Sequence, residues 1–227
     1  MGVGGIIFIL GLFLLLVIAG AIYSTIAARK RREELLEFAT RLGLDFRPGN
    51  DYELAKRFGF LNKLAQGSNR YAFNVLSGGY RQNQVLVFDY HYETHSTDSK
   101  GHRRTHHHYF SFFILLLPVS FPELKVTREG LLSKFAQALG YDDIDFESAE
   151  FSHEFCVRSK DRKFAYDVCN AQMMEYLLAN RDLSLEIEDS ALALAFDKRL
   201  SAAQIEGNLQ RLLEIRLRLP DYLFTKT

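Results

Sequence analysis

Six of the seven histidines of the chain are concentrated in one central stretch, residues 91–108. Imidazole nitrogens and carboxylate oxygens are ligands for zinc and other divalent transition metals. The stretch reads as two strands joined by a polar loop, and alternate residues of a strand share a face. With the loop at its centre, His91 would face His108 and Glu93 would face His106. One interpretation of this spacing is a metal site formed by His91, Glu93, His106 and His108.

The same histidines have a plainer interpretation, as the polar face of a solvated hairpin. A slip of one residue in the strand register would move every proposed ligand to the opposite face. Three successive histidines, residues 106–108, also alternate in direction, so at least one must point away. We therefore predict no resident cofactor and keep zinc, or another divalent transition metal, as the alternative. A histidine cluster that titrates near pH ~6.5 is a weaker alternative.

An acidic run follows at Asp142, Asp143, Asp145, Glu147 and Glu150. Paired carboxylates can act as acid and base or hold Mg²⁺ or Ca²⁺. The spacing lacks the central glycine and the twelfth-position glutamate of an EF-hand loop. Asp145 and Glu147 alternate with less polar neighbours, which predicts a short strand with one buried face.

Known catalytic signatures are missing from the sequence. It contains no phosphate-binding Gly-rich loop and no Gly-x-Ser-x-Gly nucleophile motif. His153-Glu154 is followed by Val157, where a zinc protease motif requires a second histidine. These absences favour a protein that is not an enzyme.

The N-terminal region is typical of a membrane anchor. Residues 6–23 are all apolar or glycine, and no charged residue precedes Arg29. About 20 apolar residues span the hydrocarbon core of a bilayer as a helix. The alternative is a cleaved signal peptide, but residues 1–5 lack the basic residues of such peptides. We predict a retained helix in the cell (inner) membrane, crossing once.

The basic flank of the anchor predicts its orientation. It carries four positive charges, on Arg29, Lys30, Arg31 and Arg32. Basic residues collect on the cytoplasmic side, so the N-terminus should lie outside and the remaining chain in the cytoplasm. Gly20, Ser24 and Ala28 recur every four residues, a seam that would let two anchors pack closely, but the plainer interpretation is a helix that only faces lipid.

The charge balance of the remaining chain excludes one class of function. The sequence holds 28 Lys+Arg and 28 Asp+Glu, so 24 basic and 28 acidic residues follow Arg32. A net charge of −4 without a basic face argues against nucleic-acid binding. The two cysteines, Cys156 and Cys169, form no metal or redox motif and are expected to be reduced core residues.

Periodicity and turn residues predict an α+β domain, because the strands cluster instead of alternating with helices. We expect a mostly antiparallel sheet packed by helices, with an anchor at 1–28, a juxtamembrane helix at 29–46 and the cytosolic domain at 47–227. The expected helices are 33–42, continuous with the anchor, and 51–58, 127–139, 171–179 and 201–217. The expected strands are 70–76, 84–93, 106–117, 153–158 and a second hairpin of 183–188 and 191–197, with a turn at 77–79.

Two short motifs carry a resemblance to a known family. They are Phe-Asp-Tyr-His-Tyr at residues 88–92 and Asp-Ile-Asp-Phe-Glu-Ser at residues 143–148. From the anchor to about Asp161 the chain resembles an uncharacterised family of bacterial single-pass membrane proteins. Family members usually have His-Pro after the serine, where this chain has Ala149-Glu150. The resemblance implies an anchored topology and supplies no chemistry.

These observations predict a membrane-anchored cytosolic interaction or scaffolding module. Its expected partners are the lipid bilayer and an unknown protein, and not nucleic acid. The alternative is a metal-binding domain that uses the histidine-rich hairpin. One form of this alternative is a hydrolase. Removal of residues 1–32 is expected to leave a soluble, folded domain.

Overall fold

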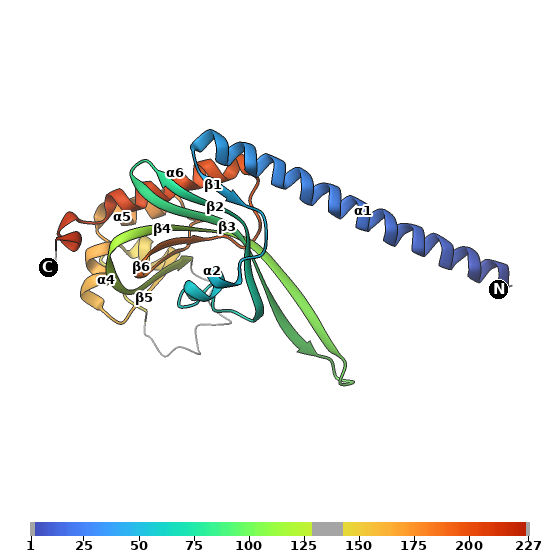
Figure 1. Cartoon of the computed structure of the whole chain (residues 1–227). Coiled ribbons are helices and arrows are strands. Elements are labelled where there is room, and N and C mark those ends of the chain that lie inside the picture. Colours follow the sequence, from blue (N-terminus) through green and yellow to red (C-terminus); the bar gives the residue numbers. More distant parts are fainter. Residues whose placement is uncertain (1–2, 129–142, 226–227) are drawn as a thin grey trace.

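A single long helix carries the apolar N-terminal segment directly into the folded domain. The computed structural model describes residues 3–128 and 143–225, and α1 (Val3–Leu42) runs without a break through the basic flank (Figure 1). The span from Leu10 to Leu42 has a window of mean hydropathy 2.3 with none of its residues buried. The helix is therefore long and apolar enough to cross a membrane, as the sequence predicted, although a signal sequence would meet the same criteria.

The domain is built on an antiparallel sheet of six described strands, which confirms the predicted α+β class. The order is β1-β2-β3-β4-β5, and β6 also pairs with β4. Each described pairing is antiparallel. The strands are β1 (Asp45–Arg47), β2 (Ser68–Tyr80), β3 (Asn83–Thr97), β4 (Arg103–Arg128), β5 (Phe155–Ser159) and β6 (Leu185–Ala195).

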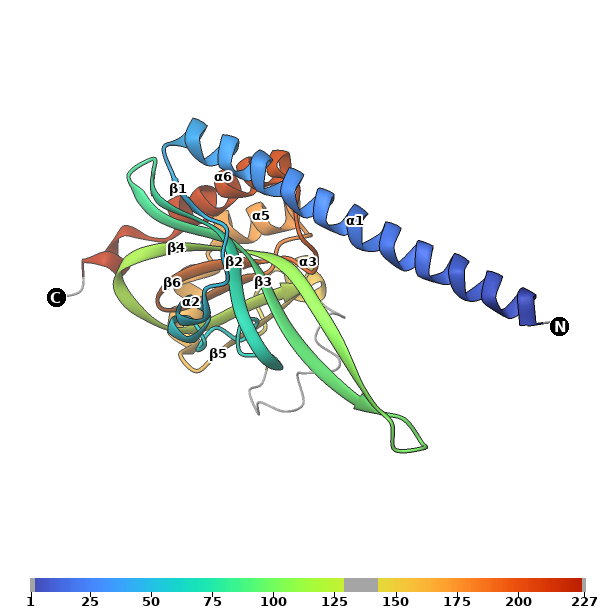
Figure 2. The ribbon, with the colours of Figure 1, turned by 45° about the vertical axis from the view of Figure 1, so that its right-hand side comes forward.

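Helices cover both faces of this sheet. The C-terminal part of α1 lies on one face with α5 and α6, and α2 lies on the other (Figures 1 and 2). The described helices after α1 are α2 (Tyr52–Arg57), α3 (Ala149–Glu154), α4 (Arg162–Val168), α5 (Ala171–Ala179), α6 (Ala202–Arg218) and the 3₁₀ helix η2 (Asp221–Phe224). Coverage on both faces explains why the centre of β4 is a continuous apolar run. Phe113 and Leu115 face one apolar cluster, and Phe112 and Ile114 face the other.

Several expected elements are confirmed. α2 and α5 form where helices were predicted, and Ser201 begins α6 with the capping box to Gln204. Cys156 and Cys169 are free and buried, as expected for reduced core residues.

Two predicted turns are wrong. Residues 77–79 belong to β2, and the chain turns instead at Arg81 and Gln82, which both have positive φ angles. A two-residue turn with that backbone matches the twist of a hairpin. The predicted second hairpin is one strand, β6, in which Asp189 has a positive φ and the pairing with β4 shifts. A bulge therefore occupies the place where the sequence suggested a reversal.

The acidic run forms no strand where it is described, at residues 143–148. In this segment Asp143 Oδ1 accepts hydrogen bonds from the amides of Ile144 and Val157. Asp142 lies outside the described residues. The predicted helix at 127–139 lies there also, except for residues 127–128, which end β4.

The hairpin of β3 and β4 extends beyond the body of the sheet. The pairing of β2 with β3 reaches Ser68 and Glu93, whereas β3 and β4 continue together to Thr97 and Arg103. We call residues 94–106 the arm. Both ribbon views show the arm leaving the domain on the side toward which the N-terminal end of α1 projects (Figures 1 and 2).

Candidate functional site

A buried ion pair joins the basic flank of α1 to the centre of the sheet. Arg31 Nε and Nη2 each donate to Asp89 at 2.8 Å, and Nη1 donates to the carbonyl of Leu200 at 2.7 Å. The Asp89 side chain is 2% exposed and also accepts from Asn74 Nδ2 and Ser111 Oγ, both at 3.0 Å. Four donors therefore satisfy this carboxylate, which a buried charge requires.

The same face of α1 supplies apolar contacts. Leu35, Phe38 and Ala39 follow Arg31 at helical spacing and are buried in the main core cluster. Arg29 and Lys30 remain exposed and pair with glutamates one turn later on α1. The basic flank is thus divided, because one of its four residues forms part of the domain interior.

Sequence reasoning missed this role of Arg31. Its signal was present, since Arg31 lies one helical turn before Leu35 on the buried face. Asp89 was a second signal, because it is an acidic residue within the apolar residues 85–90. Asp89, the aspartate of the Phe-Asp-Tyr motif, is therefore the residue of the sheet that pairs with α1.

The histidine hairpin has a register that differs by one residue from the predicted one. His91 lies opposite Tyr109, and Glu93 lies opposite His107. The predicted pairings of His91 with His108 and of Glu93 with His106 are therefore wrong. A one-residue slip exchanges the two faces of a strand. The histidine on the same face as His91 and Glu93 is therefore His107, and not His106 or His108.

The two displaced histidines bind neighbours on the opposite face of the hairpin. The ring of His108 stacks on Tyr92 with centroids 4.4 Å apart, and its Nε2 lies 2.8 Å from Thr94 Oγ1. His106 Nε2 lies 2.8 Å from Ser96 Oγ.

The structure brings together His91, Glu93 and His107. One potential ligand atom from each lies within 4.8 Å of the other two. His91 Nε2 is 3.1 Å from His107 Nδ1, and Glu93 Oε1 is 3.5 Å from the same nitrogen. Sequence reasoning found two of these three residues, and a correct register would have supplied the third.

Surrounding groups set the protonation of this cluster. Burial lowers the pKa of His91, which favours its neutral form. The Asn69 side-chain amide donates to Glu93 Oε1 at 2.7 Å and thereby lowers the pKa of that carboxyl group. A neutral imidazole and an ionised carboxylate are the forms that bind metals.

A second titratable group lies in a cavity between β4, β6 and the segment 62–66 that follows α2. Burial of Glu186 raises its pKa to about 7. Its Oε1 accepts from the backbone amide of Asn62 at 2.7 Å, and Lys125 Nζ lies 3.9 Å away. Thr127, which also lines the cavity, has a buried hydroxyl oxygen that finds no hydrogen-bond partner among the described residues. The cavity provides an acid that titrates near neutral pH, but none of the described residues that line it is an activated nucleophile.

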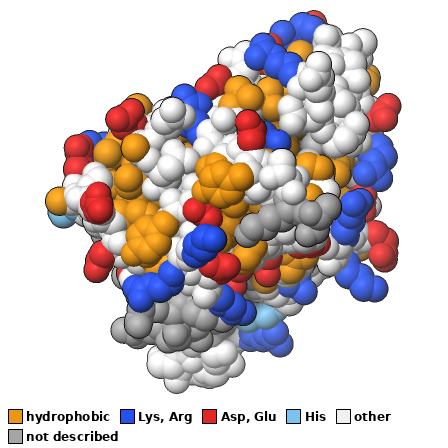
Figure 3. All heavy atoms as spheres, turned by 90° about the vertical axis from the view of Figure 1, so that its left-hand side faces the viewer, with side chains coloured by type: hydrophobic (Ala, Val, Ile, Leu, Met, Phe, Trp, Pro, Cys, Tyr) orange, Lys and Arg blue, Asp and Glu red, His pale blue; other side chains and the backbone are white. Residues whose placement is uncertain are grey.

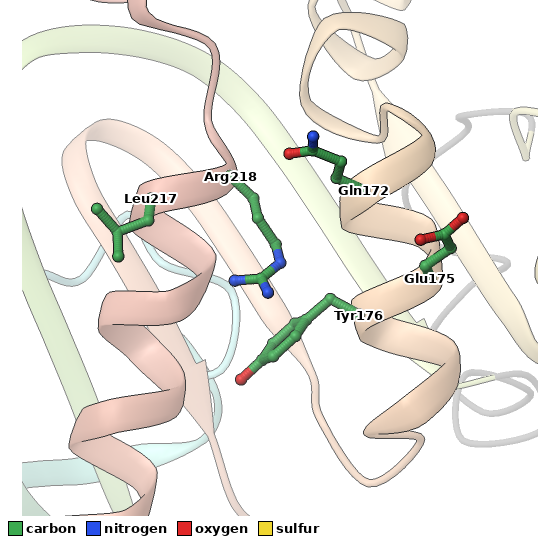
Figure 4. A pocket seen from close by; sticks show the side chains of 5 residues that line it. All are labelled: Gln172, Glu175, Tyr176, Leu217 and Arg218. Atoms are coloured by element: carbon green, nitrogen blue, oxygen red, sulfur yellow. The ribbon is translucent and has the colours of Figure 1, made fainter.

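A shallow groove between α5 and α6 has different chemistry. Arg218 lies over the ring of Tyr176, with its guanidinium carbon 4.2 Å from the ring centroid (Figure 4). Gln172, Glu175 and Leu217 complete the lining. These residues form no acid–base pair or metal set. On the face shown in Figure 3, basic and acidic side chains are mixed, so it presents no continuous basic patch.

Fold and site together define a class of protein: an α+β domain into which a long apolar N-terminal helix is locked by a buried ion pair. The chain is similar in fold to a solved structure, the mycobacterial trehalose monomycolate transport factor A, TtfA. The TM-score is 0.61 at 16% sequence identity, covering 85% of this chain and 96% of that one. No family profile and no curated protein matches the chain. The resemblance to the uncharacterised bacterial family therefore stays a prediction.

Proposed function

We propose that this chain is a membrane-anchored interaction module that assists a membrane transport process and has no catalytic activity of its own. The observation that carries the proposal is the attachment of α1 to the domain through Arg31 and Asp89. A flexible linker would let the domain tumble beside the bilayer, whereas this continuous helix holds it in one orientation. Fixed orientation near a surface raises the effective concentration for a partner in the same membrane.

The transport assignment is supported by the fold. The structural neighbour is described as a transport factor for trehalose monomycolate. Similar folds host different functions, so the cargo of that protein is not transferred to this chain. The proposal takes from it only the role of an accessory protein at a membrane.

The arm is the surface that we assign to the partner. Asp89 is hydrogen-bonded to Arg31. Arg31 lies three residues, or about 5 Å of helix, after Ala28, where the uncharged segment ends. From Asp89 to Thr97 the extended β3 covers about 25 Å. The arm points to the side on which α1 leaves (Figure 2), and its length exceeds the distance from Arg31 to the uncharged segment, so we propose that its tip reaches the membrane surface.

The chemistry of the arm suits that position. Its tip carries three cations, Lys100, Arg103 and Arg104, and all three side chains are exposed. Each such charge contributes about 1 kcal/mol of attraction at an anionic leaflet. We propose that the domain lies on the cytoplasmic side, where such lipids and the basic flank are expected. The partner is then an integral membrane protein beside the anchor.

Photo-cross-linking in native membranes tests this function. A cross-linking residue at Ser99, in the arm, should give a discrete adduct with an integral membrane protein. The same residue at Glu175, on the exposed surface of α5, serves as the control and should not. A flexible linker inserted between Ala28 and Arg29 leaves the ion pair intact and should abolish the Ser99 adduct. Equal adducts from both positions, or an adduct that survives the linker, would contradict the proposal.

A further inference from the structure

We propose that His91, Glu93 and His107 bind one divalent transition metal ion of the zinc class. The residues come from two neighbouring strands, His91 and Glu93 from β3 and His107 from β4. This metal centre is independent of the proposed interaction function, because none of its residues belongs to the arm or to the Arg31 network.

The donor atoms are already close to the spacing of a coordinated set. A zinc ion bound at about 2.0–2.1 Å in tetrahedral geometry holds its ligand atoms roughly 3.3 Å apart. The two imidazole nitrogens lie 3.1 Å apart, and the Glu93 oxygen lies 3.5 Å from His107 Nδ1. All three donor atoms lie within 4.8 Å of one another, so binding requires the His91 and Glu93 side chains to move closer together around the ion.

One residue of β2 orients two of the three ligands. The carbonyl oxygen of Asn69 lies 3.1 Å from His91 Nδ1, and a carbonyl can only accept a hydrogen bond. The proton of a neutral His91 is thus placed on Nδ1, which leaves the Nε2 lone pair directed at the cluster. The side chain of Asn69 donates to Glu93. Asn69 has a φ of 48° beside a register shift in β2, and this backbone brings both of its groups to the site.

The surroundings hold the ligands and leave an entrance. The rings of Tyr71 and Tyr109 lie 4.5 and 4.8 Å from the His91 ring, and His91 itself is 2% exposed. The side chain of His107 is 53% exposed, so an ion can approach from solvent. Three protein ligands leave one tetrahedral position for water. Two nitrogens and one carboxylate favour zinc-class ions over Mg²⁺ and Ca²⁺, which prefer oxygen ligands.

A direct hydrogen bond between the two rings competes with the ion. In the absence of metal, His107 donates from Nδ1 to His91 Nε2 over the 3.1 Å contact. To bind an ion, neutral His107 must carry its proton on Nε2 instead, which is an exchange of tautomers with no net loss of a proton. The competition limits affinity, but it keeps the two nitrogens next to each other, at 3.1 Å.

Adjacent histidines provide matched controls for a binding experiment. The full chain in detergent is treated with chelator and titrated with Zn²⁺, and Co²⁺ is added separately to record the absorption of a tetrahedral site. Wild type and His106→Ala should each bind one ion per chain. His107→Ala should bind at least tenfold more weakly and lose the cobalt spectrum. Asn69→Ala should weaken binding by about 10–100-fold, the usual effect of removing a group that orients a ligand.

A further variant guards against loss of folding. Glu93→Gln keeps an oxygen that accepts from Asn69 but removes the negative charge, so metal binding should fall while the unliganded melting temperature changes little. Equal losses in His106→Ala and His107→Ala would show adventitious binding by a mobile histidine cluster and would overturn the proposal. Absence of stoichiometric binding by the wild type would also overturn it. Neither result affects the cross-linking test of the interaction function.

Discussion

Arg31 makes a testable contribution to the stability of the domain. A fragment of residues 33–227 removes the anchor and the whole basic flank, whereas a fragment of residues 29–227 retains the cation that pairs with Asp89. Both fragments contain Leu35, Phe38 and Ala39, so the apolar contacts of α1 are unchanged. We expect the longer fragment to be the more stable one.

The expected loss of folding stability follows from the buried Asp89 carboxylate, which has no Arg31 partner in the shorter fragment. Removing one partner of a buried ion pair costs about 3–5 kcal/mol, because the remaining charge stays desolvated. Asp89 keeps its hydrogen bonds from Asn74 and Ser111, and the Arg31 side chain was 16% exposed. Both features reduce the loss, so we expect about 3 kcal/mol. For a domain of this size that corresponds to a melting temperature lower by about 6–12 °C.

Near-UV circular dichroism can follow the unfolding, because the chain contains 11 tyrosines and no tryptophan. Arg31→Met in the longer fragment should reproduce the loss, since it removes the charge and retains side-chain bulk. Arg32→Met is the matched control, because Arg32 is exposed and an exposed substitution changes stability by about 0.5 kcal/mol or less. If Arg31→Met and Arg32→Met have equal effects, the ion pair does not hold α1 in place and the argument is refuted.

Three further predictions concern other parts of the molecule. The pKa of Glu186 is raised from 4.5 to about 7 in the folded state, so the folded chain binds the proton more tightly and stability should fall by about 3 kcal/mol as the pH rises from about 4.5 to 7. Glu186→Gln should flatten the dependence of the unfolding free energy on pH, measured by urea unfolding, whereas the exposed Glu147→Gln should keep it. An equally steep dependence in Glu186→Gln would contradict the raised pKa of Glu186. Burial raises the pKa of Cys156 to about 11 and of Cys169 to about 12, so a thiol reagent at pH 8 should label neither until denaturant is added. Labelling of the native protein would show that these thiols are accessible. A reporter enzyme fused after the last residue should be active only in the cytoplasm, because the basic flank follows the anchor. Activity on the outer side would reverse the proposed orientation.

Local patterns in the sequence determined the elements whose causes are local. The uncharged run to Ala28 specifies an apolar helix, and Ser201 with Gln204 specifies the start of α6. Clustered β-branched and aromatic stretches specified an antiparallel sheet, because such residues suit pleated surfaces and short connections. These features depend on neighbours within a few residues, so the sequence alone could predict them.

Long-range placement was decided by the tertiary structure. Whether Glu93 faces His106 or His107 depends on one residue of register. The local sequence of this polar hairpin is compatible with both registers. Packing selected the observed register, because it pairs Val87 with Phe113 on one core face and Phe88 with Phe112 on the other. Likewise, Arg31 is chemically equivalent to its basic neighbours until the fold brings Asp89 to its side. A buried charge is stable only beside its partner, and that partner lies 58 residues away in the chain.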